Sequence, residues 1–160
     1  MPVFHFTLHA YNSWNADHPE GYHQHDEHGV HPPNPALGRW RSEHAKFPPM
    51  EFVQPLHQVL IDAAHDVCGR RRWRPHGIMV IPTHIHLAIS WQGARESKDV
   101  QTILKRILGL ALSRHLNMYG RTWFSEGGLP ERVKNKKHLM YLLDEYFPGH
   151  RGTYWWETVT

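Results

Sequence analysis

Residues 83–91 alternate between two kinds of side chain, and this alternation limits what the chain can fold into more than any other feature. In a β-strand successive side chains point to opposite faces, so residues two apart share a face. One face would carry His84, His86, Ala88 and Ser90, and the other Ile85, Leu87, Ile89 and Trp91. The apolar face predicts a strand that lies on a hydrophobic core. The other face places two imidazoles side by side among small residues, where a divalent metal ion could bind.

Hydrophobic periodicity predicts the elements around this strand. Helices are expected at residues 50–68, 97–119 and 136–147, and strands at residues 3–8, 75–81 and 83–91. A further extended segment is expected to begin at residues 122–124, to be interrupted at Gly127-Gly128 and to resume near Arg132-Val133. Strands separated by helices in this order predict an α+β fold. We expect a ferredoxin-like sandwich with a mostly antiparallel sheet and helices packed on it.

A single domain of residues 1–160 is expected, because this length suits one hydrophobic core. An irregular insertion interrupts it at about residues 12–49, where Gly, Pro, Asn, Asp and His dominate and the prolines of residues 32–35 would break regular structure. The insertion contains His18, His23, His25, His28 and His31. Their spacing matches no tight zinc motif and no cysteine accompanies them, so adventitious metal binding is the expectation.

The composition excludes several classes of protein. Hydrophobic residues make up 40% of the chain and aromatic residues 12%, which suits a folded rather than a disordered protein. No apolar run reaches the ~18 residues of a membrane span, so no membrane association is expected. The first residues lack the features of a signal peptide, and the single cysteine, Cys68, cannot form an internal disulfide. Together these features predict a cytoplasmic protein.

Positive charge is concentrated in short segments, although the formal net charge is only +3. The candidate cations are Arg70, Arg71, Arg72 and Arg74, then Lys105 and Arg106 on a helix surface, then Lys134, Lys136 and Lys137. Cations contact phosphates and tryptophans stack on unpaired bases, so these segments favour a polyanion partner. A solvated surface is the ordinary alternative for such runs. For Trp123, a buried position in the core is favoured over stacking.

The motif His84-Ile85-His86, preceded by an apolar segment with Met79 and Pro82, resembles the metal site of the single-tyrosine HUH transposases. This family includes the REP-associated tyrosine transposases of bacteria. The likeness covers roughly residues 1–11 and 50–150. It continues with a long basic helix, the pairs Trp123-Phe124 and Arg132-Val133, and a helix with tyrosine near its end. Thr83 departs from the family pattern, which often has Asn or Glu there.

The resemblance implies an enzyme that cleaves and rejoins DNA strands. In the family, a tyrosine attacks a phosphodiester of single-stranded or hairpin DNA, giving a 5′-phosphotyrosine link and a free 3′-OH. A divalent metal, Mg²⁺ or Mn²⁺, is held by the histidine pair and one further residue and polarises the phosphate. The resemblance also implies a nucleoid-associated protein, with members acting as homodimers or as monomers.

The family's nucleophile lies on the last helix, and the third metal ligand follows it by four residues, which is one helical turn. Tyr146 with His150 and Tyr141 with Glu145 both have this spacing. Tyr146 is favoured because it falls at the expected end of the helix, although Pro148-Gly149 interrupts the turn that follows. Tyr141 lies in a leucine-rich stretch that would also suit a core aromatic. The implied metal ligands are then His84, His86 and His150.

One other interpretation stays open, and a second is disfavoured by a missing motif. A domesticated, non-catalytic DNA-binding module would keep the same fold without the chemistry. A two-histidine phosphoesterase needs two His-x-Thr/Ser motifs, and the chain offers His5-Phe6-Thr7 but has Ala88 two residues after His86.

Overall fold

One antiparallel sheet organises the computed structural model of the chain, which describes residues 1–13, 18–22 and 29–158. Its strands are β1 (Val3–His9), β2 (Arg74–Ile81), β3 (His84–Ser90), β4 (Glu131–Arg132) and β5 (Thr153–Trp156). They lie in the order β4-β1-β3-β2-β5, so that β3 is the central strand. The predicted α+β class with a mostly antiparallel sheet is confirmed.

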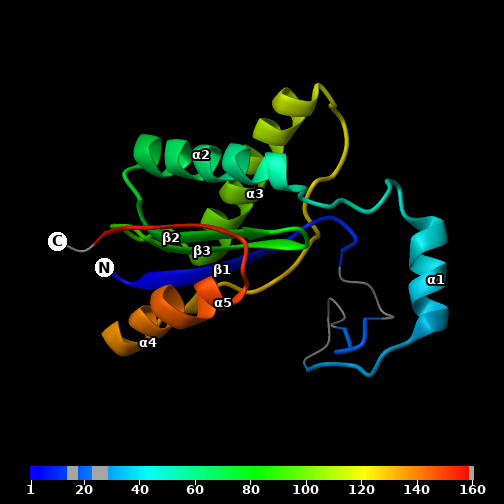
Figure 1. Cartoon of the computed structure of the whole chain (residues 1–160), viewed down its shortest axis with the longest axis horizontal. Coiled ribbons are helices and arrows are strands. Elements are labelled where there is room, and N and C mark those ends of the chain that lie inside the picture. The colour runs from blue at the N-terminus through cyan, green and yellow to red at the C-terminus, as the bar shows by residue number, and fades with distance from the viewer. Residues whose placement is uncertain (14–17, 23–28, 159–160) are drawn as a thin grey trace.

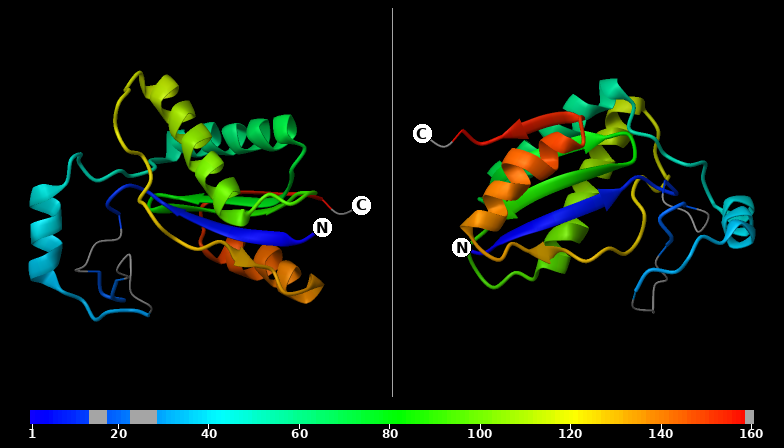
Figure 2. Two further views of the ribbon diagram at one scale, coloured as in Figure 1. Left: turned by 180° about the vertical axis from the view of Figure 1, so that it is seen from behind. Right: turned by 60° about the horizontal axis from the view of Figure 1, so that its bottom comes forward.

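Helices cover both faces of the sheet (Figures 1 and 2). Helices α2 (Gln54–Arg71) and α3 (Ser97–Leu116) pack on one face. The other face carries a continuous helical segment made of α4 (Lys136–Tyr141), the π-helix η1 (Leu142–Tyr146) and α5 (Phe147–Gly149). Among the described helices, none combines the length and hydrophobicity that crossing a membrane requires.

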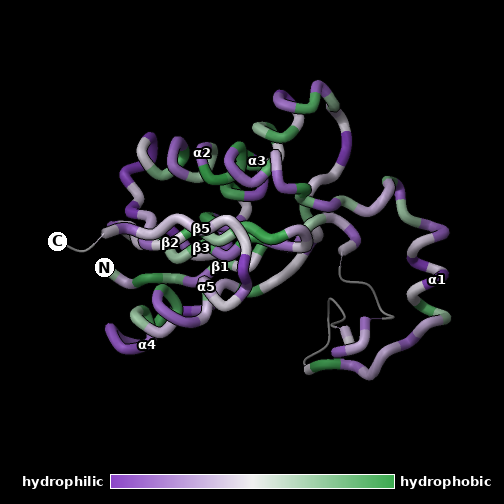
Figure 3. Tube along the Cα trace, viewed as in Figure 1, coloured by the Kyte–Doolittle hydropathy of each residue, from purple (hydrophilic) through white to green (hydrophobic). Residues whose placement is uncertain are grey.

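The alternation of the strands sorts their side chains into two cores. Phe6, Leu87 and Ile89 belong to a large cluster beneath α2 and α3. Met79 and Ala88, from the opposite face, pack in a smaller cluster with side chains of η1 and α5. Figure 3 shows the hydrophobic segments running along the strands and the inner sides of α2 and α3. The histidines of β1 and β3 lie on the face of the smaller cluster.

Residues 12–49 are not wholly irregular, which corrects the expectation from sequence. Helix α1 (Pro35–His44) begins there, away from the sheet in Figure 1. Pro35 occupies the first helical turn, where a missing N–H costs nothing, and the Asn34 side chain accepts a 3.0 Å hydrogen bond from the Leu37 amide. The proline run therefore starts a helix rather than preventing one. His23, His25 and His28, the centre of the histidine-rich stretch, lie outside the described residues.

Strand β5, which the sequence did not predict, is tied to the sheet by a buried polar chain. His76 Nε2 lies 2.8 Å from Ser90 Oγ, and its Nδ1 hydrogen-bonds to Glu157, just beyond β5. Arg74 Nε also donates to Glu157, at 2.9 Å. Although burial opposes the charge, the hydrogen bonds from His76 and Arg74 lower the pKa of Glu157. Ser90 is only 1% exposed, so this Ser–His–Glu chain holds structure and offers no accessible nucleophile.

Candidate functional site

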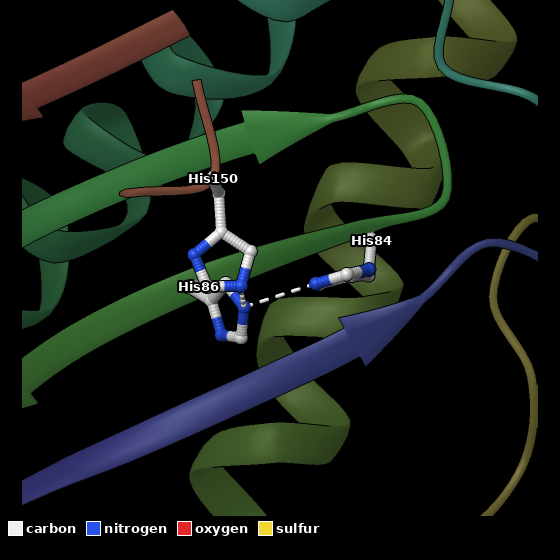
Figure 4. A group of neighbouring side chains, drawn as sticks. All are labelled: His84, His86 and His150. Carbon is white, nitrogen blue, oxygen red and sulfur yellow. Dashed lines mark hydrogen bonds between the residues drawn. The ribbon is translucent and has the colours of Figure 1, made fainter. Parts of the chain in front are cut away.

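Three histidines from two layers of the fold meet on the face of the smaller core. His84 and His86 project from β3, and His150 reaches them from the end of α5 (Figure 4). His84 Nε2 lies 2.9 Å from His86 Nε2, and His86 Nε2 lies 3.1 Å from His150 Nε2. In the described part of the chain, this is the group of three metal-ligating side chains that could hold an ion.

Neighbouring oxygens orient two of these rings. His150 Nδ1 donates a 2.7 Å hydrogen bond to the Tyr146 carbonyl, one turn earlier in the chain. A neutral imidazole that carries its proton on Nδ1 has a lone pair on Nε2, so His150 presents a ligand atom to His86. His84 Nδ1 lies 2.8 Å from the Thr83 hydroxyl, which leaves Nε2 facing the same point. Thr83 thus contacts the site.

Burial keeps the strand histidines neutral. It lowers the pKa of His84 to about 3 and that of His86 to about 2, with nearby histidines as the second cause. Each neighbouring imidazolium would repel a further positive charge at these separations. Near pH 7 both rings are therefore in the neutral form that ligates metals.

The donor set fits a divalent transition metal. Two ligands at right angles, each about 2.1 Å from an ion, are about 3 Å apart, close to the two Nε2 separations found here. Unprotonated nitrogens that face each other at this distance repel unless a proton or a cation lies between them. The convergence of His84, His86 and His150 is therefore compatible with a bound cation, and without one a proton between the rings accounts for the same separations.

Tyr146 is the tyrosine that lies beside this group. Its ring centroid is 5.3 Å from that of His86 and 4.7 Å from that of His150. Burial, then the nearby Tyr141 and Glu131, raise the pKa of Tyr146, so the phenol is protonated at neutral pH. Pro148-Gly149 does not separate Tyr146 from His150, because α5 supplies the needed turn.

Tyr141 lies one step further out. Its ring centroid is 6.1 Å from that of Tyr146, and 48% of its surface is exposed, so it is not a core aromatic. Glu145, its proposed partner, is exposed and is not among the three clustered ligands. The structure brings the pair Tyr146 and His150 to the histidines and leaves Tyr141 and Glu145 outside.

The π-helix that carries Tyr146 packs closely on the sheet at Gly77. Gly77 on β2 permits this approach, since a side chain there would meet Leu143 and Phe147. A π-turn adds a residue to the helical turn, and such turns often occur at functional sites. Neither the π-turn nor the close approach has a signal in the sequence beyond Gly77 itself.

The structure separates the predicted basic residues into three places. The end of α2 and the start of β2 carry Arg70, Arg71, Arg72 and Arg74. Helix α3 carries Lys105 and Arg106, and the start of α4 carries Lys134, Lys136 and Lys137. Arg70 pairs with Asp66 and Arg74 with Glu157, so part of the first group is already neutralised. The lysines of the third group are exposed and belong to the helical layer that carries Tyr146.

A cleft between α3 and residues 119–127 was not predicted. Exposed Arg106 and Tyr119 line it, and Arg121 stacks over Trp123 at 4.7 Å. The Lys105 ammonium donates to the carbonyls of Ser125 and Gly127, at 2.9 and 2.8 Å. Lys105 therefore shapes the loop rather than offering a free charge.

The tryptophans also differ in their surroundings. Trp123 is buried, as expected, and donates a 2.8 Å hydrogen bond to Ser113. Trp73 is buried as well, so it is not available to stack on a base. Trp156 is 51% exposed on β5 and stays a candidate for stacking.

Comparisons with family models, with curated proteins and with solved structures find no match to this chain. The geometry of the histidines and Tyr146 is therefore the basis for any statement about function.

Proposed function

We propose that the protein is a metal-dependent nuclease and strand transferase that acts on single-stranded DNA through a 5′-phosphotyrosine intermediate on Tyr146. The observation that carries this proposal is the convergence of the Nε2 atoms of His84, His86 and His150 beside the Tyr146 ring. A cation beside the phenol would offset the negative charge of the phosphodiester, which otherwise repels an anionic nucleophile.

His84, His86 and His150 would hold the ion. When bound, a divalent cation supplies positive charge against the oxygens of the scissile phosphate and opposes the burial that raises the pKa of Tyr146. Imidazole donors favour Mn²⁺ over Mg²⁺, which prefers oxygen ligands, although either would accept the phosphate oxygen as a further ligand.

In the strand-cleaving step, the Tyr146 hydroxyl is the nucleophile and the 3′ oxygen of the DNA is the leaving group. The Tyr146 oxygen forms a bond to phosphorus, and the bond between phosphorus and the 3′ oxygen breaks. The phenol loses its proton and the departing 3′ oxygen gains one, so the products are a 5′-phosphotyrosine link and a free 3′-OH. Attack of a 3′-OH on that link reverses the step and rejoins a strand without any other energy source.

The remainder of the fold supports a nucleic-acid substrate. The strand order β4-β1-β3-β2 with helices on the sheet is compatible with the ferredoxin-like arrangement expected for such enzymes. Lys134, Lys136 and Lys137 lie on the layer of Tyr146, where exposed cations would contact the phosphates that flank the cleaved bond.

A covalent-capture assay tests the proposal. Hairpin oligonucleotides with single-stranded flanks of mixed sequence, labelled at the 3′ end, are incubated with protein and Mn²⁺ and separated on a denaturing gel. Label that migrates with the protein is expected, because the downstream fragment keeps its 5′-phosphate on the tyrosine.

Matched variants identify the nucleophile. Tyr146→Phe is expected to abolish the adduct and Tyr141→Phe to retain it, and chelation of the metal should prevent it in the wild type. The reverse pattern for the two tyrosines would move the nucleophile to Tyr141. Hairpin binding without any adduct would instead identify a non-catalytic DNA-binding module.

A further inference from the structure

His5 contacts the Nδ1 side of the His86 ring, opposite the Nε2 atom that faces His84 and His150. Strand β1 runs antiparallel to β3, with Thr7 paired to His86 and His5 paired to Ala88, so His5 is the diagonal neighbour of His86. His5 Nε2 lies 2.9 Å from His86 Nδ1, and the Thr7 hydroxyl lies 3.2 Å from the same nitrogen. His5 is only 7% exposed, so this contact is buried.

The contact constrains where the proton of His86 lies. For Nε2 of His86 to offer a lone pair toward His84 and His150, its proton must be on Nδ1. That N–H then needs an acceptor, and His5 Nε2 is the nearer of the two at hand. His5 can accept only if its own proton is on Nδ1.

Glu131 lies where it would hold that second proton. It is the cross-strand partner of His5 in the pairing of β1 with β4. Glu131 Oε2 lies 3.9 Å from His5 Nδ1, within range of charge attraction although longer than a direct hydrogen bond. A carboxylate on this side of the ring favours the tautomer with the proton on Nδ1.

We propose that His5 is a positioning residue, which, oriented by Glu131, fixes His86 in the tautomer and ring orientation that ligate a metal. The inference rests on the metal site of the proposed function and adds residues that do not touch the ion. Metal-bound histidines commonly donate their other ring N–H to an acceptor that fixes the tautomer and raises ligand basicity. Here the His5 imidazole is the acceptor, and the Glu131 carboxylate lies on the far side of the His5 ring.

The arrangement explains why β1 carries a buried polar side chain among apolar ones. His5 follows Phe4 and precedes Phe6, and its ring packs against both His86 and Phe147 at centroid distances of 5.0 and 5.4 Å. A buried imidazole without a role would be costly relative to an apolar residue of the same size. Its hydrogen bond to His86 satisfies a polar nitrogen of this buried ring.

The first test measures the tautomer directly and needs no substitution. Long-range proton–nitrogen NMR spectra of the Zn²⁺-loaded wild-type protein distinguish a proton on Nδ1 from one on Nε2. With metal on Nε2 of His86, the proposal expects the His86 proton on Nδ1 and His5 with its own proton on Nδ1, so that His5 Nε2 accepts. A proton on Nε2 of His5 would overturn it.

The second test measures metal affinity in folded variants by titration with Co²⁺, followed by its visible absorption. His5→Phe removes the acceptor and is expected to weaken binding by about 10–100-fold. His5→Gln, whose side-chain oxygen can accept from Nδ1, is expected to retain most of the affinity and the wild-type Co²⁺ spectrum. Glu131→Gln is expected to have a smaller effect than His5→Phe, and exposed Glu145→Gln no effect.

The outcomes separate this inference from the proposed function. Equal affinity in the wild type and in folded His5→Phe would overturn the positioning role while leaving the metal site intact. A wild-type protein that binds no Co²⁺ would overturn the metal site together with the positioning role that rests on it. Circular dichroism establishes that each variant is folded before it is titrated.

Discussion

The Nε2 atoms of His86 and His150 lie 3.1 Å apart, although 64 residues separate the two histidines in the chain. His86 belongs to the central strand of the sheet, and His150 ends the helical segment that crosses one face. Neither layer alone holds the three nitrogens, so the site exists only when the helical segment is docked on the sheet.

Replacing any of the three histidines should remove metal binding. His84→Ala, His86→Ala and His150→Ala each delete one nitrogen of a three-nitrogen set, and each should weaken Mn²⁺ or Co²⁺ binding by more than the 10–100-fold typical of residues behind the ligands. Isothermal titration calorimetry measures the dissociation constants. His65→Ala, which removes a ring packed on Trp155, is the control and should bind metal normally. Unchanged affinity in His150→Ala would reduce the site to the two strand histidines.

The metal-free protein should lose stability as the pH falls below about 6.5. Burial, with nearby histidines, lowers the pKa of His5, His84 and His86 to about 4, 3 and 2, whereas each is near 6.5 in the unfolded chain. Below pH 6.5 the unfolded state therefore binds more protons, and the free energy of unfolding falls by up to about 1.4 kcal/mol per pH unit for each histidine.

Urea unfolding at pH 7.5, 6.0 and 5.0, with a chelator present, measures this dependence. The loss should begin near pH 6.5 and continue toward pH 4, and His86→Phe should reduce the slope by about one proton. A free energy of unfolding that stays constant from pH 7.5 to 5.0 would contradict the neutral, buried state of these rings.

Single-stranded DNA binding should depend on the lysines at the start of α4 more than on the arginines of α2. The triple variant Lys134→Ala, Lys136→Ala, Lys137→Ala should weaken binding and reduce the salt slope by about 0.7 for each phosphate that the variant no longer neutralises. Arg70→Ala should change little, because Arg70 is paired with Asp66 at 3.0 Å. Fluorescence anisotropy of a labelled oligonucleotide across a series of salt concentrations measures both quantities. An equal effect of Arg70→Ala would move the binding surface to the other side of the molecule.

Two glycines that flank His150 should respond oppositely to alanine. A side chain on Gly152 would collide with the Val80 carbonyl and with Ile81, so Gly152→Ala should push α5 and β5 from the sheet and weaken metal binding. Gly149 has open space around it, and Gly149→Ala should leave affinity unchanged and stabilise the helical turn by up to about 1 kcal/mol. Metal titration and thermal unfolding of both variants test this contrast. Equal behaviour would show that the close contact at Gly152 does not position His150.

The alternation in residues 83–91 was sufficient to predict β3 and the face of its histidines. Period-two patterns are explicit in a single strand, and β3 is apolar on one side throughout. The resemblance to the transposases offers two pairs with the one-turn spacing, and the structure brings the favoured one, Tyr146 and His150, to the strand histidines. These features were readable because each depends on residues close together in the chain.

Features that depend on pairing between distant segments could not be predicted from the sequence. The contact of His5 with His86 follows from the register of β1 against β3, which no single strand specifies. Strand β5 is aromatic on both sides and has no alternation, so its place beside β2 is decided by tertiary contacts. The final helix was expected to be continuous over 136–147, but a π-turn interrupts it where it packs over Gly77.

The same division of the ligands between a strand and a helix end would make a bound ion a cross-link. The ion would join His86 to His150 and so close the loop between them. Closing this loop reduces the conformational entropy that the chain gains when the last helical segment leaves the sheet. Because His150 donates a hydrogen bond to the Tyr146 carbonyl, the ligand that holds the cation also fixes the backbone position of the proposed nucleophile. Binding of the metal would then also position Tyr146 for attack, and removal of the metal by a chelator would abolish both.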